Sequence, residues 1–241
     1  MKYQGQTDIG VMRHSNQDSF KVLQLDDGSL LAVVCDGMGG ANAGNVASEK
    51  ATEVITSFFE RSYRTGLDSQ GITALLQSAI VSANIEVYDM AQENPEFSGM
   101  GTTVVATYIN RDFFVVSHLG DSRAYLISDE VIQLTRDHSV VQNLVESGKL
   151  TPEEARVHPR RNVITRALGI EADILVESNE FKANEGDFLL LCSDGLSNFI
   201  KPENILEIFK GENFEDVAKI LVKTANQNGG ADNITVVAVS V

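Results

Sequence analysis

The sequence predicts an α+β fold in four layers, with two antiparallel sheets packed face to face and a pair of helices outside each sheet. Two observations carry this prediction. The strand-like segments come in runs joined by short turns, which is typical of antiparallel hairpins. The helical segments come in two separate pairs, so they do not alternate with single strands as they would in a parallel sheet. An α-β-β-α sandwich would bury the apolar face of every element.

The first third of the chain contains three predicted strands followed by two long helices. The strands are expected over 1–9, 18–25 and 29–35, the first at a sheet edge and the other two joined by a hairpin turn at Asp26-Asp27-Gly28. From residue 45 the apolar residues recur at helical spacing to about residue 64, and Gly66 then breaks the pattern. A second helix is expected over 72–92, where Asn94-Pro95 ends it.

The remaining segments return to strands and finish with the second helix pair. Strands are expected over 102–109, 113–118, 123–128, 131–134, 174–181, 188–192 and 233–241, and helices over 202–209 and 214–226. Residues 136–168 differ from the rest, because they are polar and contain only short helical stretches. One of these begins at Thr151-Pro152-Glu153-Glu154, which is a capping box with proline at the first helical position. We interpret 136–168 as a mobile flap inserted over the sheet.

Composition limits the class of protein. The 241 residues fit a single domain, 1–241, and the formal net charge of −15 argues against nucleic acid and against anionic membrane as partners. No apolar run approaches the length of a membrane span, and the first residues carry no secretory signal. The two cysteines form no C-x-x-C pair, so we expect buried thiols in a reducing compartment and a cytoplasmic protein.

Five aspartates stand at the edges of predicted strands in five separate segments. Asp36 ends an apolar run and opens a glycine-rich turn, Asp36-Gly37-Met38-Gly39-Gly40. An Asp-Gly pair after a strand is also an ordinary turn, so this motif alone decides nothing. The other four carboxylates have comparable settings: Asp18, Asp121, Asp194 and Asp232. Five such positions predict one acidic centre assembled by the fold.

Converging carboxylates would need divalent cations to offset their repulsion. Ligand sets made only of oxygen favour Mg²⁺ or Mn²⁺, and the carbonyl of Gly37 could add a neutral oxygen to Asp36, Asp194 and Asp232. Two such ions about 4 Å apart can share a water molecule and lower its pKa, so that the resulting hydroxide attacks phosphorus directly. Arg13, five residues before Asp18, could clamp the phosphate, although an ordinary surface arginine fits the same pattern.

The sequence offers no obvious protein nucleophile for a phosphoester. It contains no G-x-S-x-G elbow and no C-x5-R loop. Its four histidines, His14, His118, His138 and His158, form no H-E-x-x-H pair. We interpret each histidine as a surface residue or as a hydrogen-bonded residue of the interior rather than as a metal ligand.

Over nearly its whole length the chain resembles the metal-dependent Ser/Thr protein phosphatases of the 2C type in their compact bacterial form. The ordered set of motifs carries the resemblance, since each motif alone is weak. The motifs are Thr7-Asp8-x-Gly10, Arg13-x-x-Asn16-x-Asp18, Asp36-Gly37-Met38-Gly39-Gly40, Gly101-Thr102-Thr103, Gly120-Asp121-Ser122-Arg123, Asp137-His138-Ser139, Cys192-Ser193-Asp194-Gly195-Leu196 and Asp232-Asn233-Ile234-Thr235.

The resemblance implies a β-sandwich flanked by helix pairs and the hydrolysis of phosphoserine and phosphothreonine on proteins by a metal-bridging hydroxide. By the family pattern Asp36 would bridge two Mn²⁺ or Mg²⁺ ions, completed by Asp194 and Asp232 on one side and by the Gly37 carbonyl on the other. Asp121 with Asp194 would suit the third ion of bacterial members, Asp18 would hold water, and Arg13 would bind substrate phosphate. We expect phosphorylated protein substrates and a cognate Ser/Thr kinase as partners. We also expect the enzyme to be a monomer.

Three positions depart from the pattern of many members. Gln17 stands where glutamate is common, Ala41 where histidine is common, and Met38 where eukaryotic members have a histidine proposed as general acid. Two other functions stay open on the sequence. One is a non-catalytic relative that binds phosphoproteins or a kinase, although such relatives usually lack metal ligands and all five aspartates are present here. The other is a phosphatase for a different phosphoester, such as a regulator of sigma-factor antagonists.

Overall fold

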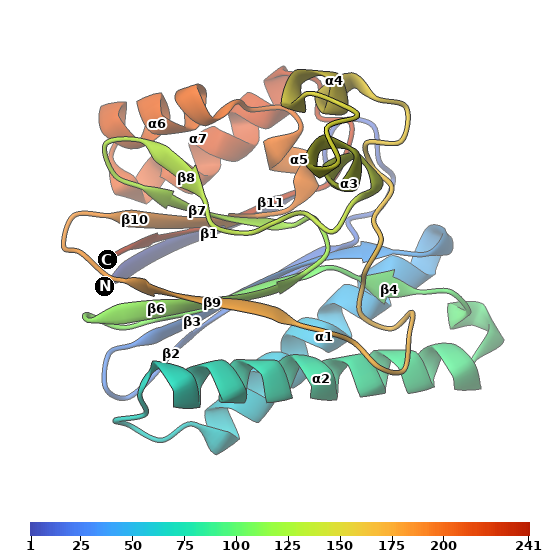
Figure 1. Ribbon diagram of the computed structural model, residues 1–241, viewed down its shortest axis with the longest axis horizontal. Coiled ribbons are helices and arrows are strands. Elements are labelled where there is room, and N and C mark those ends of the chain that lie inside the picture. The colour runs from blue at the N-terminus through green and yellow to red at the C-terminus, as the bar shows by residue number, and fades with distance from the viewer.

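The computed structural model describes the backbone of residues 1–241 and every side chain except those of Ala41 and Asn42. Two antiparallel sheets pack face to face between two helical layers, as Figure 1 shows. The first sheet has the order β1-β11-β10-β7-β8, with bounds Lys2–Asp8, Ile234–Ser240, Phe188–Cys192, Arg123–Ile127 and Val131–Gln133. Strand β1 lies at the edge of this sheet, as its alternating pattern predicts.

The second sheet has the order β2-β3-β5-β6-β9, and a short strand, β4, pairs with the end of β3. The bounds are Asp18–Gln24 for β2, Leu30–Met38 for β3, Gly101–Thr102 for β4, Val104–Ile109 for β5, Phe113–Leu119 for β6 and Glu177–Lys182 for β9. The register of the β2–β3 hairpin places Asp18 opposite Asp36, so two of the five aspartates are neighbours across one strand pair.

The helices cover the outer faces of the sheets. Helices α1 (Gly40–Ser62) and α2 (Ser69–Glu93) pack on the second sheet, whereas α5 (Asp194–Ser197), α6 (Pro202–Gly211) and α7 (Phe214–Gln227) pack on the first. Buried apolar residues form three clusters, one under each helical layer and one between the sheets. These clusters confirm the predicted α-β-β-α sandwich, because every sheet face that meets another layer contributes apolar side chains.

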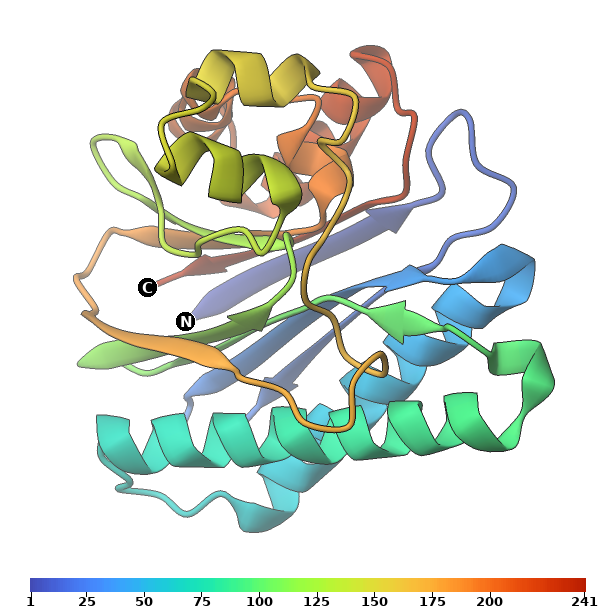
Figure 2. The same ribbon diagram turned by 45° about the vertical axis from the view of Figure 1, so that its right-hand side comes forward.

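The flap forms two short helices and then a long irregular segment. Helices α3 (Val140–Glu146) and α4 (Pro152–Val157) lie outside both sheets, on the same side as α5 (Figures 1 and 2). The capping box predicted at Thr151 and Glu154 is present at the start of α4. Residues 158–176 then run down the side of both sheets to α2, which Figure 2 shows in gold.

Three local predictions differ from the structure, and two short elements were not predicted. Helix α1 begins at Gly40 rather than at residue 45, and the strand expected from residue 174 begins only at Glu177. The strand predicted over 102–109 is split, because Thr103 leaves the ladder to bond Asp36 instead. The four-residue helix α5 and the 3₁₀ turn Pro95–Phe97 (η1) lie in segments without a predicted element, being too short to show a helical period.

Two further observations complete the comparison with the sequence. In the part of the chain that the structure describes, no helix combines the length and the apolar character needed to cross a membrane. The side chain of Ala41, one of the three departures from the family pattern, lies outside the described residues.

We expect the apolar layer under α2 to dominate the stability of this half of the sandwich. Leu76 is fully buried against the second sheet, whereas Ile85 on the same helix is 51% exposed. Leu76→Ala should lower the free energy of unfolding by about 2–5 kcal/mol, because it removes buried methyl groups and leaves a cavity. Ile85→Ala, the matched control, should change it by no more than about 0.5 kcal/mol. Urea unfolding of both variants measures this, and equal effects would contradict the assigned burial.

Candidate active site

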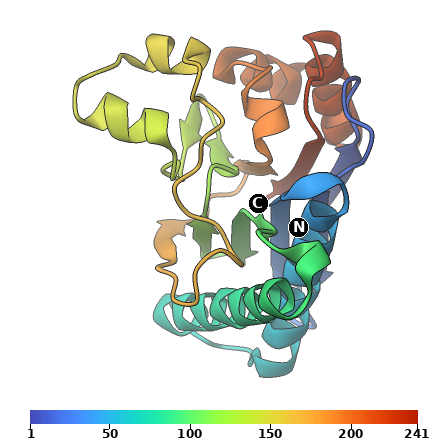
Figure 3. The same ribbon diagram turned by 90° about the vertical axis from the view of Figure 1, so that its right-hand side faces the viewer.

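Six of the seven predicted site residues line one cleft of about 710 Å³ at the side of the sandwich. They come from distant parts of the chain. Arg13 lies in the loop 9–17, Asp36 and Gly37 at the end of β3, Asp121 in the β6–β7 turn, Asp194 at the start of α5, and Asp232 just before β11. Figure 3 faces this side, where the loop 9–17, the start of α1 and α5 come together. The ends of strands from both sheets therefore build the cleft.

The seventh residue, Asp18, lies beneath the cleft rather than in its lining. Its side chain is 8% exposed, and its Oδ2 accepts a hydrogen bond from the Ser193 hydroxyl at 2.7 Å. Asp18 begins β2 in the second sheet, whereas Ser193 follows β10 in the first. The same Ser193 oxygen accepts a hydrogen bond from the Thr235 N–H at 3.0 Å. This one hydroxyl thus joins the two sheets directly below the acidic cluster.

Two glycines permit the close approach of these segments. A Cβ on Gly37 would lie 2.0 Å from the Gly44 carbonyl oxygen, and one on Gly195 would lie 1.9 Å from the Asn233 carbonyl oxygen. Both contacts are with backbone, which cannot move aside cheaply. The first contact sets α1 against the end of β3, and the second sets α5 against the loop that carries Asp232. The two Asp-Gly pairs lie within β3 and α5, so these glycines are packing requirements of the site rather than turn residues.

Several residues that the sequence analysis assigned no role hold the aspartates in place. Thr103 donates its N–H to the Asp36 carbonyl oxygen at 2.9 Å and accepts the Asp36 N–H on its hydroxyl at 3.0 Å. Asn233 accepts the Gln17 N–H at 2.8 Å, and its amide donates to the carbonyl oxygens of Ile9 and Ser15 at 2.9 and 3.0 Å. The only sequence signal for these residues is their place within the motifs, Thr103 in Gly101-Thr102-Thr103 and Asn233 directly after Asp232.

Gln17 has a structural contact in addition to its place in the cleft. Its side-chain amide donates to the Gly40 carbonyl oxygen at 3.0 Å, at the first residue of α1. The neutral amide therefore fixes the loop 9–17 against the glycine-rich turn, a contact that a glutamate at this position could not donate.

The clustered carboxylates raise one another's pKa values. Burial is the largest cause, and repulsion from neighbouring aspartates adds to it. The pKa rises to about 7 for Asp18, to about 8 for Asp121 and to about 6 for Asp194, and it lies well above the ordinary range for Asp36. One buried oxygen of Asp18 and one of Asp194 have no hydrogen-bond partner. These donors are all oxygen atoms, and a divalent cation would offset the repulsion between them. Such a donor set fits Mg²⁺ or Mn²⁺.

Arg13 brings a positive charge to the rim of the cleft. Its Nη2 donates to Asp232 Oδ2 at 2.8 Å, while its side chain is 49% exposed. This hydrogen bond is the largest cause that raises the pKa of Arg13. A guanidinium carries five N–H donors, so the bond to Asp232 leaves others to meet an anion in the cleft.

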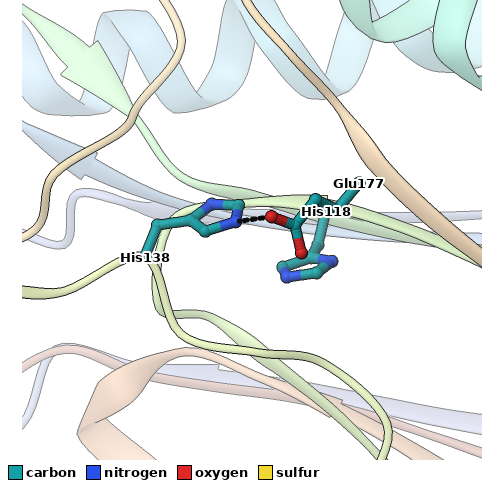
Figure 4. Close-up of side chains that lie close together, drawn as sticks. All are labelled: His118, His138 and Glu177. Carbon is teal, nitrogen blue, oxygen red and sulfur yellow. Dashed lines mark ion pairs between the residues drawn. The ribbon is translucent and has the colours of Figure 1, made fainter. Parts of the chain in front are cut away.

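An ion pair, a stacked pair of histidines and a bond to Glu177 fix the base of the flap. Arg123 on β7 makes a two-pronged bond to Asp137, with distances of 2.9 and 2.7 Å. Beside it the rings of His118 and His138 stack with centroids 5.0 Å apart, and His138 Nε2 lies 3.0 Å from Glu177 Oε1 (Figure 4). We call His118, His138 and Glu177 the flap anchor, because His138 belongs to the flap and the others to β6 and β9.

The flap anchor has the residue types of a metal site, and its three ligand-type atoms lie within 4.8 Å of one another. Its hydrogen bonds assign a different role. His138 Nδ1 accepts the Gly120 N–H at 3.1 Å, so the proton of the neutral ring is on Nε2, facing Glu177. His118 Nε2 donates to the Arg136 carbonyl oxygen at 2.8 Å, and Arg166 also bonds Glu177 at 3.0 Å. His138 therefore has no ring nitrogen free for a cation, because Nδ1 accepts a hydrogen bond and Nε2 carries the proton.

Burial is the largest cause that lowers the pKa values of both histidines, so both rings are neutral at pH 7. Both residues are almost fully buried, which agrees with their interpretation as hydrogen-bonded residues of the interior rather than as ligands. The sequence analysis did not anticipate that they stack, because they lie on different elements.

Comparison with known proteins identifies the family of this chain. The family model described as Protein phosphatase 2C matches residues 12–235. The serine/threonine phosphatase stp of Listeria innocua is 38% identical over 235 residues, covering 97% of this chain and 93% of the relative. The crystal structure of the serine/threonine phosphatase Stp1 from Staphylococcus aureus has a TM-score of 0.94 at 36% identity, covering 100% of this chain and 94% of that one.

A second similar structure contains metal. It is the catalytic domain of the serine/threonine protein phosphatase PstP in complex with two manganese ions, with a TM-score of 0.86 and 34% identity, covering 98% of this chain and 96% of that one. The fold, the acidic cleft and these comparisons define a phosphoprotein phosphatase. The chain belongs to the protein phosphatase 2C family, which confirms the resemblance found in the sequence.

The repulsion within the cluster predicts that Asp36→Asn stabilises the metal-free protein at high pH. The raised pKa values mean that the folded state holds more protons than the unfolded chain, so stability falls as the pH rises through about 6 to 8. A neutral side chain at position 36 removes one repelling charge. In excess chelator at pH 8 we expect the Tm of the variant to exceed that of the wild type by several degrees, since each kcal/mol moves Tm by about 2–4 °C.

Burial and the neighbouring carboxylates raise the pKa of Asp36 well above its ordinary range, so the repelling charge at this position falls as the pH is lowered, and the difference should be smaller at pH 5. Asp89→Asn, an exposed aspartate on α2, is the control and should leave Tm unchanged at both pH values. A lower Tm for Asp36→Asn than for the wild type at pH 8 would show that the cluster is not repulsive.

The flap anchor predicts that Glu177→Gln loosens the flap. The neutral amide loses the ion pair with Arg166 and accepts a weaker hydrogen bond from His138. We expect trypsin to cut after the exposed arginines at 156, 160 and 161 about two- to tenfold faster, because local opening of the flap lets the backbone around them enter the protease. Glu180→Gln, an exposed position on the same strand, should leave the rate unchanged. Equal cleavage rates in the two variants would remove the role of Glu177.

Proposed function

We propose that this chain removes phosphate from phosphoserine and phosphothreonine on proteins, with two Mn²⁺ or Mg²⁺ ions as cofactors. One observation carries the proposal. Five predicted oxygen donors and one arginine, from segments up to 219 residues apart, meet in a single cleft of a protein phosphatase 2C chain. The manganese-bound relative supports the choice of ions.

In this proposal Asp36, Asp194, Asp232 and the Gly37 carbonyl hold the two ions, and Asp121 with Asp194 holds a third. All of these residues line the cleft. When bound, the ions supply Lewis acidity, which activates water and offsets the charge that develops on the phosphoryl oxygens. The reaction then needs no nucleophilic side chain.

The chain's own residues bind the phosphate and orient the water. Arg13 lies over the cleft with N–H donors left for phosphate oxygens once Asp232 has taken one. Asp18 spends one oxygen on Ser193 and keeps the other, Oδ1, without a partner, so Oδ1 is placed to accept a proton from water. Asp18 thus positions water from beneath the cluster.

The departing serine or threonine oxygen needs a proton to leave. Met38 lines the cleft where a histidine would stand in eukaryotic members, and a thioether has no proton to give. Solvent therefore supplies this proton in our proposal. The open cleft gives water direct access to the leaving oxygen.

The biological setting follows from the substrate class. A Ser/Thr kinase that makes the phosphoproteins is the natural counterpart of this enzyme, which we propose acts as a monomer in the cytoplasm. The buried thiols of Cys35 and Cys192, which form no disulfide, are compatible with a reducing compartment.

Release of phosphate from a phosphothreonine peptide tests the proposal. We expect turnover with Mn²⁺ and none in excess chelator. Asp36→Asn and Asp194→Asn should each lower kcat at least about a hundredfold, because each removes a charge that holds the ions. Asp89→Asn should retain full activity, and thermal unfolding shows whether the variants are folded.

Three outcomes would change the conclusion. Full metal-dependent activity in either cluster variant would overturn the assigned ligands. Folded wild-type protein without any activity would favour a phosphoprotein-binding relative. Hydrolysis of small phosphoesters but not of phosphopeptides would favour a phosphatase for another ester.

A further inference from the structure

A second groove, of about 390 Å³, lies next to the acidic cleft and has a different chemical character. Its volume is within the range of about 300–1,000 Å³ found for binding pockets. Its wall is the gold segment that runs from the flap toward α2 in Figure 2. The residues that define its character are Met38, Ile164, Ile170, Leu175, Glu171 and Asp173.

The groove adjoins the cleft. Met38 and Ile164 line both of them. Met38 follows directly after Gly37, so the shared wall stands beside the proposed metal centre. A peptide whose phosphorylated residue occupies the cleft therefore has its neighbouring residues at the entrance of the groove.

A buried polar side chain holds the wall of the groove in place. Asn84 on α2 is fully buried, and its amide donates to the carbonyl oxygens of Glu171 and Ala172 at 2.9 and 3.0 Å. Its Oδ1 accepts the Gly169 N–H at 2.8 Å. Three hydrogen bonds from one helix thus fix the segment just before β9. A wall fixed in advance lowers the entropic cost of binding.

The groove presents apolar side chains that have nothing to cover them. Leu175 is 70% exposed and Ile170 is 45% exposed, although both are large and apolar. Grouped apolar exposure beside a polar rim marks a surface that another molecule covers. Since the groove shares a wall with the cleft, its occupant belongs with the phosphorylated residue.

The charged residues of the groove favour a cation. Glu171 and Asp173 are both exposed on its wall. The one arginine in the lining, Arg166, is bonded to Glu177 at 3.0 Å, so its charge is largely offset. An incoming Lys or Arg would meet two carboxylates at the groove, within a chain of net charge −15.

We propose that this groove binds the part of the phosphoprotein substrate that adjoins the phosphorylated residue, and that it selects an apolar side chain next to Lys or Arg. The apolar side chain packs on Ile170 and Leu175, and the basic side chain pairs with Glu171 and Asp173. This inference rests on the proposed phosphatase function and specifies its substrate class.

Phosphothreonine peptides that differ only beside the phosphorylated residue test the selection. The peptides carry one of three residue pairs next to phosphothreonine: leucine with lysine, alanine with lysine, or leucine with glutamate. Each pair is tested on either side of phosphothreonine. The control substrate is p-nitrophenyl phosphate, which cannot reach the groove. We expect kcat/KM for the leucine–lysine peptide to exceed that of each other peptide about five- to tenfold on one side of phosphothreonine.

Groove variants connect the selection to these residues. Leu175→Ala should lower the ratio of kcat/KM for the leucine–lysine peptide to kcat/KM for p-nitrophenyl phosphate about fivefold. Glu171→Lys should lower the same ratio about tenfold. It should also raise kcat/KM for the leucine–glutamate peptide, because the charge preference reverses. Matched controls are Ile132→Ala, 40% exposed on β8, and Glu60→Lys, exposed on α1, and both should leave the ratio unchanged.

The outcomes separate the two proposals. If the wild type hydrolyses neither peptides nor p-nitrophenyl phosphate, the proposed function fails. If it hydrolyses the peptides at equal rates, or if the groove variants keep the wild-type ratio, the groove proposal is overturned while the phosphatase function stands.

Discussion

Repulsion between carboxylates held in one cleft is the constraint on which the rest of this structure depends. Each aspartate of the cluster would lower its energy by moving away from the others, and the fold prevents this with short, buried contacts. The Ser193 hydroxyl bonds Asp18 across the two sheets, and Thr103 holds the backbone of Asp36 on both sides. Gly195 lets α5 press against the loop that carries Asp232. Bound cations would offset the repulsion, so we expect the arrangement to be more stable with the ions than without them.

The three apolar clusters provide the rigidity that such an arrangement requires. The cluster between the sheets joins β3 and β5 to β10 and β11, which lead directly into the site. Close-packed protein interiors deform little under load, so the strand ends keep their spacing although the carboxylates on them repel one another. The outer clusters fix α2 and α5 on their sheets, and through Asn84 the α2 layer also shapes the groove beside the cleft. The packing of the apolar clusters therefore determines the positions of the site residues.

The sequence predicted the layers and most of the strands, because hydrophobic periodicity reports local structure directly. It also predicted that the aspartates converge, since each one ends or begins an apolar strand. It did not show that Asp18 lies beneath the cleft, because this depends on the pairing of β2 with β3 and on a hydroxyl 175 residues away. The stacking of His118 on His138 and the clamp of Asn84 on residues 169–172 are likewise long-range contacts. Periodicity carries no information about such pairs.

The flap anchor has a consequence for how such a protein can diversify. His138 receives the N–H of Gly120, whose neighbour Asp121 belongs to the acidic cleft, and the same ring bonds Glu177 on β9. Any change that tilts the base of the flap therefore also displaces a cleft residue. The helices α3 and α4 lie farther out and have no fully buried side chains. New specificities can arise by substitution in these outer helices. The flap anchor beneath them can change less, because it contacts the backbone next to the cleft residue Asp121.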